Sequence, residues 1–377
     1  MKPNCLNKAN KPDIALFIPS LRGGGAERVM LRLAEGFAER GLAVDLVLAQ
    51  HEGEYINQVP SMVRVINLHS HRVIQSLPSL TKYLRQLRPK AMISAMNHAN
   101  IVAILAAKIA NVDTCLIVTE HLHLTSSMKY KLHLRESLIP MLIKLCYPLA
   151  DHVVAISEEM KRDLQGYTSA PIRVIYNPVI TQAIFSEALK SPTLDHFITD
   201  GTPLILGAGR LTQQKDFETL IHAFNIVRNK RLARLIIIGE GEERSTLQSL
   251  VTKLGVKDVF LPGFVQNPYA LMARATVFVL SSKWEGLPTV LIEAMALGTP
   301  IVSTDCPTGP REILRNGDFG ILVPIGDAQR MAEAILSVLD APGKYKTLPE
   351  RDTWVQNFAL ENVVQKYLDI INLDKHK

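Results

Sequence analysis

Four charged residues in the second half of the chain have types and positions suited to binding an anionic, hydroxyl-rich ligand. Arg210 and Lys215 stand five residues apart in GAGRLTQQKDFETL. A guanidinium and an ammonium on one loop suit a diphosphate, because the first donates forked hydrogen bonds and the second is a point charge. Glu285 and Glu293 lie in EGLPTVLIEAMALGTP. Ionised carboxylates accept hydrogen bonds from vicinal sugar hydroxyls. The alternatives are a solvated basic pair and a structural salt bridge at Glu293.

Glycines at two places extend this pattern. Gly23, Gly24 and Gly25 follow an apolar run, and glycine there lets the backbone approach an anion. The same three residues could also be only a tight turn. Gly239 and Gly241 form a lone Gly-x-Gly, which is a weak signal and more often a turn.

The first half of the chain alternates strand-like and helical segments. Residues 25–40 carry apolar side chains at helical spacing, and Gly41 stands where a helix would end. Strand, glycine-rich turn, helix and strand make one parallel unit. The expected strands are 14–20, 43–49, 91–96, 115–120 and 152–157.

The periodicity weakens over residues 173–203 and then starts again. Helices are expected at 216–230 and 327–340, and the end of the chain, 353–373, also has a helical pattern. The sequence therefore predicts an α/β protein of two doubly wound, Rossmann-like domains, residues 1–184 and 203–355, joined by a linker over 185–202. The expected strands of the second domain are 204–209, 234–239, 259–263, 276–282, 300–304 and 319–324.

The candidate ligand residues fall where such sheets bind ligands. Loops beyond the carboxyl ends of parallel strands lead into helix N-termini, whose amides and dipole attract anions. Pro288 fits the first turn of a helix that ends near Gly298. Glu285 is therefore expected in the loop above the sheet, and Glu293 nearly two turns into the helix.

Composition agrees with a globular protein. Of 377 residues, 47% are hydrophobic and 21% charged, and no apolar stretch is long enough to span a membrane. The opening MKPNCLNKANKP lacks the apolar core of a secretory signal, so a cytoplasmic location is expected. The four cysteines have no paired spacing, which favours reduced, buried thiols over disulfides or a metal site: Cys5, Cys115, Cys146 and Cys306.

The net charge of +6 comes from the first half. Residues 1–180 hold 21 Lys and Arg against 14 Asp and Glu, which gives 21 − 14 = +7; the remainder gives 21 − 22 = −1. A basic half is compatible with an anionic membrane, a phosphorylated substrate or nucleic acid. Nucleic acid ranks last, because no recognisable binding module is present. Residues 128–149 mix basic and apolar side chains on a possible helix, although a face turned to the core is the commoner reason for such a pattern.

The ordered motifs resemble the retaining glycosyltransferases of family four, which have the GT-B fold with two domains facing each other across a cleft. The resemblance rests on GGGAERV, GAGRLTQQKDFETLI, LIIIGEGEER, FLPGF and SSKWEGLPTVLIEAMALGTPIVSTDCPTGPREIL. It is closest to bacterial enzymes that extend lipid-linked glycans and surface polysaccharides. In this family the terminal helix, here residues 356–377, crosses back onto the first domain.

The resemblance implies a role for each matching position. Arg210 and Lys215 would hold the donor diphosphate, Glu293 the ribose hydroxyls and Glu285 the donor hexose. His121 in VTEHLHL would lie near the reacting sugar, with Glu120 and His123 as weaker neighbours. The catalytic set is thus His121, Glu285, Arg210 and Lys215. Further substrate contacts are expected at Gly24, Gly25, Gly241, Phe264, Gly286, Leu287, Thr289, Val290 and Glu293.

The implied activity is transfer of a hexose from a nucleotide sugar, expected to be UDP-linked, to a glycan or polyprenyl-diphosphate-linked acceptor with retention. Preplaced cations and helix amides would stabilise the leaving diphosphate, so no metal or other cofactor is expected. The chain contains no Asp-x-Asp, in agreement with that expectation. Peripheral contact with an anionic membrane is a further expectation. The alternatives are a nucleotide-sugar epimerase and an inactive nucleotide-sugar binding subunit. A dinucleotide oxidoreductase fits less well, since GGGAERV lacks the spaced glycine fingerprint.

Overall fold

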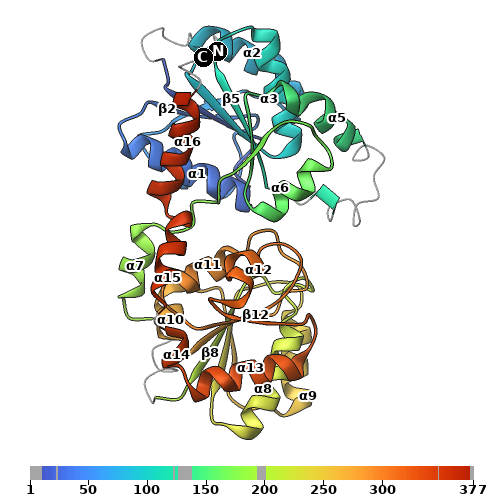
Figure 1. Cartoon of the computed structure of the whole chain (residues 1–377), viewed down its shortest axis with the longest axis vertical. Helices are drawn as coiled ribbons and strands as arrows, with labels where there is room; N and C mark the ends of the chain where they lie inside the picture. The colour runs from blue at the N-terminus through green and yellow to red at the C-terminus, as the bar shows by residue number, and fades with distance from the viewer. Residues whose placement is uncertain are drawn as a thin grey trace. The chain divides into compact units, whose positions relative to one another are not determined.

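The chain forms two compact units, each built around a parallel sheet (Figure 1). The computed structural model describes residues 11–22, 24–121, 124–125, 138–192, 201–346 and 348–373. The first unit comprises Met1–Pro178 and Leu360–Lys377, and the second comprises Val179–Ala359. The expected positions Cys5, Gly23 and His123 lie outside the described residues. So do residues 128–137, which begin the predicted basic and apolar helix, and most of the second half of the linker.

The division between the units lies between Pro178 and Val179, before the boundary expected after residue 184. Helix α7 (Gln182–Ala188), placed by the sequence at the domain end and linker, belongs to the second unit. It is fastened there by hydrogen bonds from Asn267 Nδ2 to Glu187 O (2.8 Å) and from Arg274 to Ala188 O (3.3 Å). The second unit likewise extends to Ala359 and not 355, because the amides of Val179 and Ile180 both donate to Phe358 O.

The first unit holds a sheet of seven parallel strands in the order β3-β2-β1-β4-β5-β6-β7. The order reverses between β1 and β4, which makes this pair the switch point where doubly wound sheets bind ligands. The strands are β1 (Ile14–Ile18), β2 (Val44–Leu48), β3 (Arg64–Asn67), β4 (Ala91–Ala95), β5 (Cys115–Glu120), β6 (His152–Ala155) and β7 (Ile172–Val174). The helices are α1 (Gly25–Glu39), α2 (Leu77–Leu87), α3 (Asn97–Ala110), α5 (Ile139–Cys146), α6 (Glu158–Gln165) and α16 (Leu360–Leu373).

The second unit holds six parallel strands in the order β10-β9-β8-β11-β12-β13, with its switch point between β8 and β11. The strands are β8 (Leu204–Ala208), β9 (Arg234–Ile238), β10 (Val259–Gly263), β11 (Val277–Leu280), β12 (Ile301–Thr304) and β13 (Ile321–Val323). Its further helices are α8 (Phe217–Lys230), α9 (Arg244–Leu254), α10 (Tyr269–Arg274), α11 (Thr289–Ala296), α12 (Pro310–Ile313), α13 (Ala328–Asp340), α14 (Gly343–Lys346) and α15 (Pro349–Val355).

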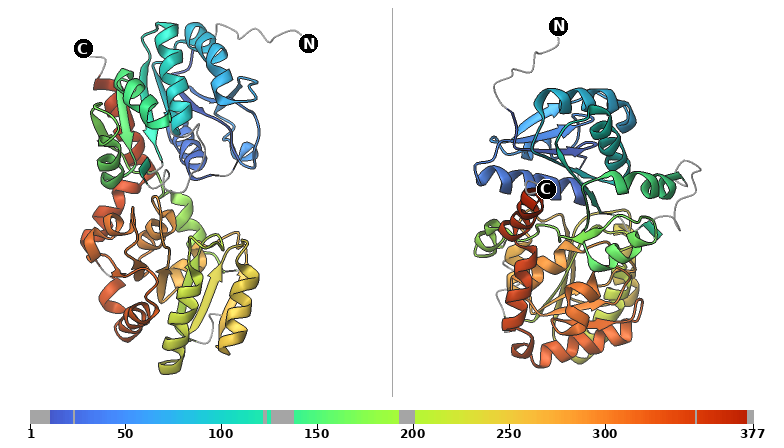
Figure 2. Two further views of the ribbon diagram at one scale, coloured as in Figure 1. Left: turned by 90° about the vertical axis from the view of Figure 1, so that its right-hand side faces the viewer. Right: turned by 45° about the horizontal axis from the view of Figure 1, so that its top comes forward.

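Helices cover both faces of each sheet, which is why the central strands read as continuous apolar runs (Figure 2). In β1, Ile14, Leu16 and Ile18 pack with α1 and α16, whereas Ala15 and Phe17 pack with α2 and α3 on the other face. Successive side chains of a strand point to opposite faces, so one five-residue strand contributes to both cores.

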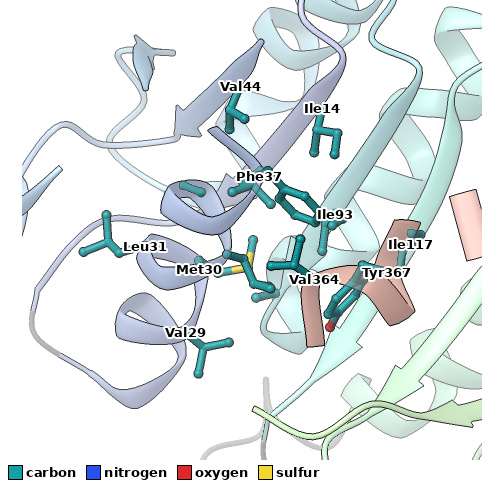
Figure 3. Packing of buried hydrophobic residues seen from close by; sticks show 14 of the residues in the cluster. Ile14, Val29, Met30, Leu31, Phe37, Val44, Ile93, Ile117, Val364 and Tyr367 are labelled. Atoms are coloured by element: carbon teal, nitrogen blue, oxygen red, sulfur yellow. The ribbon is translucent and has the colours of Figure 1, made fainter. Parts of the chain in front are cut away.

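The terminal helix α16 packs against α1 within the first unit, as the resemblance implied (Figure 3). Phe37 and Tyr367 meet edge to face, with ring centroids 6.4 Å apart. A Cβ at Gly36 would lie 2.7 Å from Val364, so glycine at this position permits the close approach of the two helices. The helical pattern of 353–373 is interrupted at Ala359, which has extended backbone angles.

Candidate donor-binding site

Lys215 and Glu285 form a nearly buried ion pair at the switch point of the second sheet. Lys215 follows β8 and Glu285 follows β11, and Lys215 Nζ lies 2.5 Å from Glu285 Oε1. The side chains are 17% and 7% exposed. Ser282 Oγ donates to the same carboxylate oxygen at 2.6 Å. The structure therefore brings together two residues that the sequence places 70 positions apart, and joins them directly.

Each partner keeps bonding capacity for a ligand. An ammonium has three protons, so one bond to Glu285 leaves two for phosphate oxygens. Within the described part of the chain, no side chain bonds to Glu285 Oε2. Arg210, at the start of the same loop, is exposed, and its guanidinium has no ion pair with a described residue. The loop after β8 thus carries two cations, and the loop after β11 carries one available carboxylate oxygen.

Glycine at 239 and 241 lets the loops after β8 and β9 pack backbone against backbone. A Cβ at Gly239 would lie 1.9 Å from Gly209 O, and one at Gly241 would lie 2.2 Å from Leu211 O. Leu211 N donates to Glu240 O at 2.9 Å. Gly241 therefore has a clear packing role that fixes the Arg210 loop, while its contact with substrate remains a prediction.

Glu293 lies on α11 and is buried, with 5% of its surface exposed. Tyr269 OH lies 3.5 Å from Glu293 Oε1. Helix α11 starts at Thr289. Pro288, which was expected in the first turn, is the N-cap residue just before the helix, and no side chain caps the helix. The first amides of an uncapped helix have no partner within the helix, so those of Thr289 and Val290 are suited to an anion.

The loop before α11 is held by a second loop, residues 305–309. Thr308 Oγ1 donates to Glu285 O, and a Cβ at Gly309 would lie 2.5 Å from Pro288 Cδ and 2.8 Å from Gly286 O. The adjacent Cys306 thiol is buried, and its burial together with the Glu285 charge raises its pKa to about 12. Cys146 is also a free, buried thiol, as predicted, whereas Cys115 is only partly buried.

Two aromatic residues lie near these loops and are accessible. Phe264 directly follows β10 and is 78% exposed. Trp284 precedes Glu285 and is 38% exposed, and its carbonyl accepts from Gln214 Nε2 at 2.8 Å. Trp284 and Ser282 are not among the site residues predicted from the sequence. Ser282 could have been found as the end of the expected strand 276–282.

In the first unit, Gly24 and Gly25 begin α1 at the carboxyl end of β1. Gly24 is the N-cap and Gly25 the first helical residue, with no side-chain cap. A Cβ at Gly24 would lie 2.3 Å from Glu27 Oε2, so only glycine allows the Glu27 carboxylate to fold against this turn.

His121 follows β5 in the same unit and is half-buried. Its Nε2 lies 3.0 Å from Thr119 Oγ1, and burial lowers the pKa of the imidazole to about 4. The neighbouring Glu120 is 1% exposed and accepts from Tyr147 OH at 2.6 Å. Glu120 thus has a structural role inside the unit, in keeping with its weaker ranking.

Two Rossmann-like units in tandem, each with a parallel sheet, are the architecture of the glycosyltransferases with the GT-B fold. A family model described as "Glycosyl transferases group 1" matches residues 195–357, and one described as "Glycosyltransferase Family 4" matches residues 23–183. Among solved structures, that of Anabaena HepE in complex with UDP superposes with a TM-score of 0.77 at 19% identity, covering 96% of this chain and 99% of that chain.

Curated relatives of the chain are likewise named as glycosyltransferases. The chain is 30% identical over 343 residues to the N-acetylgalactosamine-N,N'-diacetylbacillosaminyl-diphospho-undecaprenol 4-alpha-N-acetylgalactosaminyltransferase of Campylobacter jejuni, covering 87% of this chain and 90% of that protein. It is 26% identical over 356 residues to the amylovoran biosynthesis glycosyltransferase AmsD of Erwinia amylovora, covering 93% and 96%. The chain belongs to the family-four glycosyltransferases. No helix in the described residues is long and apolar enough to cross a membrane.

Proposed function

We propose that the protein transfers a hexose from a UDP-sugar to a glycan or polyprenyl-diphosphate-linked acceptor, with retention of configuration and without a metal ion. The observation that carries the proposal is the Lys215–Glu285 pair at the β8/β11 switch point, with Arg210 on the same loop as Lys215. Relatives named for undecaprenol-linked substrates, and a structural neighbour solved with UDP, support the two substrate classes.

The donor is held by charge. Arg210 and Lys215, with the first amides of α11, receive the diphosphate, and Glu293 accepts hydrogen bonds from the ribose hydroxyls. Glu285 Oε2 accepts from a hydroxyl of the hexose, while its Oε1 remains on Lys215. Phe264, which is largely exposed, offers an apolar surface to the base.

In the reaction, the bond between the anomeric carbon and the β-phosphate oxygen breaks and a bond to the acceptor oxygen forms. The acceptor proton passes to the leaving phosphate. Negative charge grows on the diphosphate as the bond breaks, so the preplaced cations of Arg210 and Lys215 stabilise the transition state more than the ground state. Attack from the side on which the diphosphate leaves retains the anomeric configuration, and the preplaced cations take the role that a metal ion has in other transferases.

The test incubates the full chain with labelled nucleotide sugars, with and without polyprenyl-diphosphate glycans, in EDTA. A product formed only with acceptor, with α linkage from an α-linked donor, supports the proposal. A changed sugar without acceptor supports an epimerase, and binding without turnover supports an inactive subunit; either result overturns the transferase assignment. Activity that requires added Mg²⁺ or Mn²⁺ would contradict metal independence alone.

We also propose that α5 and the turn after it rest on an anionic membrane that carries the acceptor. One face of this segment exposes five apolar side chains at helical spacing, and the opposite face, with Ile143, is buried. Exposed Lys144 flanks the apolar face, and the first half of the chain carries the basic excess. The apolar residues are Leu138, Met141, Leu142, Leu145 and Leu149, exposed by 37–59%.

The membrane proposal is tested by sedimentation with phosphatidylglycerol vesicles at low salt. Met141→Gln with Leu145→Gln removes two half-exposed apolar groups, worth together about 2 kcal/mol on insertion, so vesicle affinity should fall about thirtyfold. Met62→Gln, in the same unit and 58% exposed, is the matched control and should bind as wild type. Equal loss in both variants, or no wild-type binding, would contradict the proposal.

A further inference from the structure

Thr119 holds His121 through a hydroxyl that is already committed to another acceptor. Thr119 Oγ1 donates to Ser94 O, the backbone carbonyl at the end of the neighbouring strand β4, at 2.9 Å. The same oxygen lies 3.0 Å from His121 Nε2. A hydroxyl has one proton and two lone pairs. Because the proton goes to Ser94 O, Thr119 can only accept from His121, and Nε2 must carry the imidazole proton.

The other ring nitrogen is then a bare acceptor. Burial lowers the pKa of His121 to about 4, so the ring is neutral near pH 7 and carries a single proton. With that proton on Nε2, Nδ1 presents a lone pair. Within the described residues, Nδ1 has no hydrogen-bond partner. A half-buried, neutral acceptor beyond the end of β5 is suited to a hydroxyl donor and would not attract an anion.

Packing and hydrogen bonds hold the Thr119 side chain in this orientation. Its side chain is β-branched and almost completely buried, with 1% of the residue exposed. Its carbonyl accepts from Asn100 Nδ2 at 2.9 Å, and that amide group also donates to Tyr147 OH at 3.1 Å. Tyr147 in turn donates to Glu120. The network fixes the strand end from which the Thr119 hydroxyl projects.

We infer that Thr119 is a positioning residue, which keeps His121 in the Nε2–H tautomer and so presents Nδ1 as an acceptor for a substrate hydroxyl. The proton on Nε2 follows from the geometry around Thr119, and the bare Nδ1 follows from the neutral, buried ring. The identity of the hydroxyl, on the donor hexose or the acceptor sugar, rests on the proposed function.

The first test reads the tautomer directly. Long-range ¹H–¹⁵N spectra of histidine-labelled full-length protein at pH 7 distinguish protonated from bare ring nitrogens, and His121→Gln assigns the signals. Wild type and Thr119→Ser should show a protonated Nε2 and a bare Nδ1. In Thr119→Val, a buried Nε2–H would face a methyl group without an acceptor, so the proton should move to Nδ1. A protonated Nδ1 in wild type, or an unchanged tautomer in Thr119→Val, overturns the inference.

The second test identifies the substrate hydroxyl that donates to His121 Nδ1. Thr119→Val should lower kcat/KM roughly ten- to a hundredfold, and Thr119→Ser should restore it to within about threefold of wild type. Among deoxy analogues of the donor and acceptor sugars, one should lose its penalty in Thr119→Val while the others keep theirs. Equal penalties in wild type and variant would overturn the substrate part. If no transfer activity exists at all, the spectra still decide the positioning role, so the two failures are distinguishable.

Discussion

Replacing Lys215 with methionine should destabilise the second unit as well as abolish transfer. Among the side chains that the structure describes, the change leaves the Glu285 carboxylate, 7% exposed, with the Ser282 hydroxyl as its one hydrogen-bond partner. Removing one partner of a buried ion pair costs about 3–5 kcal/mol, because the remaining charge stays desolvated. Lys215 keeps 17% exposure, which lets water reach the vacated position. We therefore expect a loss of about 3 kcal/mol in the free energy of unfolding.

The double variant Lys215→Met, Glu285→Gln separates stability from chemistry. Neutralising Glu285 removes the unpaired buried charge. The double variant should therefore lose about 2 kcal/mol less than the sum of the two single losses, and this difference is the coupling energy between the two sites. Transfer activity should not return, because the cation for the diphosphate is still missing. Lys190→Met breaks an exposed pair with Glu187 in the same unit and should cost less than about 1 kcal/mol.

Tryptophan fluorescence is the assay, since both tryptophans of the chain, Trp284 and Trp354, belong to the second unit. Urea titrations followed by this signal report that unit's unfolding separately from the first. A free energy of unfolding for Lys215→Met within about 0.5 kcal/mol of the wild-type value would contradict this expectation, because neutral surface substitutions have effects of about that size. The expectation is also refuted if the double variant loses the sum of both single losses.

Three further predictions concern other parts of the two units. Gly239→Ala should destabilise the second unit by about 3 kcal/mol in urea, because φ is +135° and the new Cβ would meet Gly209 O, whereas Gly255→Ala, in open space at φ +60°, should cost only about 1 kcal/mol. The unfolded chain protonates His121 near pH 6.5 but the folded unit only near 4, so the first unit should lose up to about 3 kcal/mol as pH falls through that range. Hydrogen exchange of β5 amides measures this loss, and His121→Phe should lack it. Glu293→Ala should weaken UDP binding at least tenfold in a Trp284 fluorescence titration while binding of free pyrophosphate stays within threefold, and equal weakening of both would contradict a ribose contact.

The fold was predictable where one strand or helix has a strong periodic pattern. The expected strands at 14–20, 43–49, 91–96, 115–120 and 152–157, and all six of the second domain, correspond to strands of the structure. Strands β3 (Arg64–Asn67) and β7 (Ile172–Val174) were missed, because neither has a fully buried residue that would give an apolar run. The helix break at Ala359 was missed because it depends on hydrogen bonds from Val179 and Ile180, far away in the sequence.

The candidate site was predictable in its residue types and loops but not in its contacts. Motif spacing places Lys215 and Glu285 in loops after two strands, yet only the strand order puts β8 beside β11 and lets the pair form. Likewise, the Thr119–His121 bond depends on where Ser94 O lies in the neighbouring strand. Such contacts follow from tertiary pairing, which a single sequence does not encode locally.

The most direct test of the donor-site assignment is a crystal structure of the protein with a UDP-sugar bound. We expect diphosphate oxygens within hydrogen-bond distance of Arg210 and Lys215, and ribose hydroxyls on Glu293. A nucleotide bound away from the carboxyl ends of β8 and β11, or a Glu293 carboxylate without a ligand contact, would contradict the account.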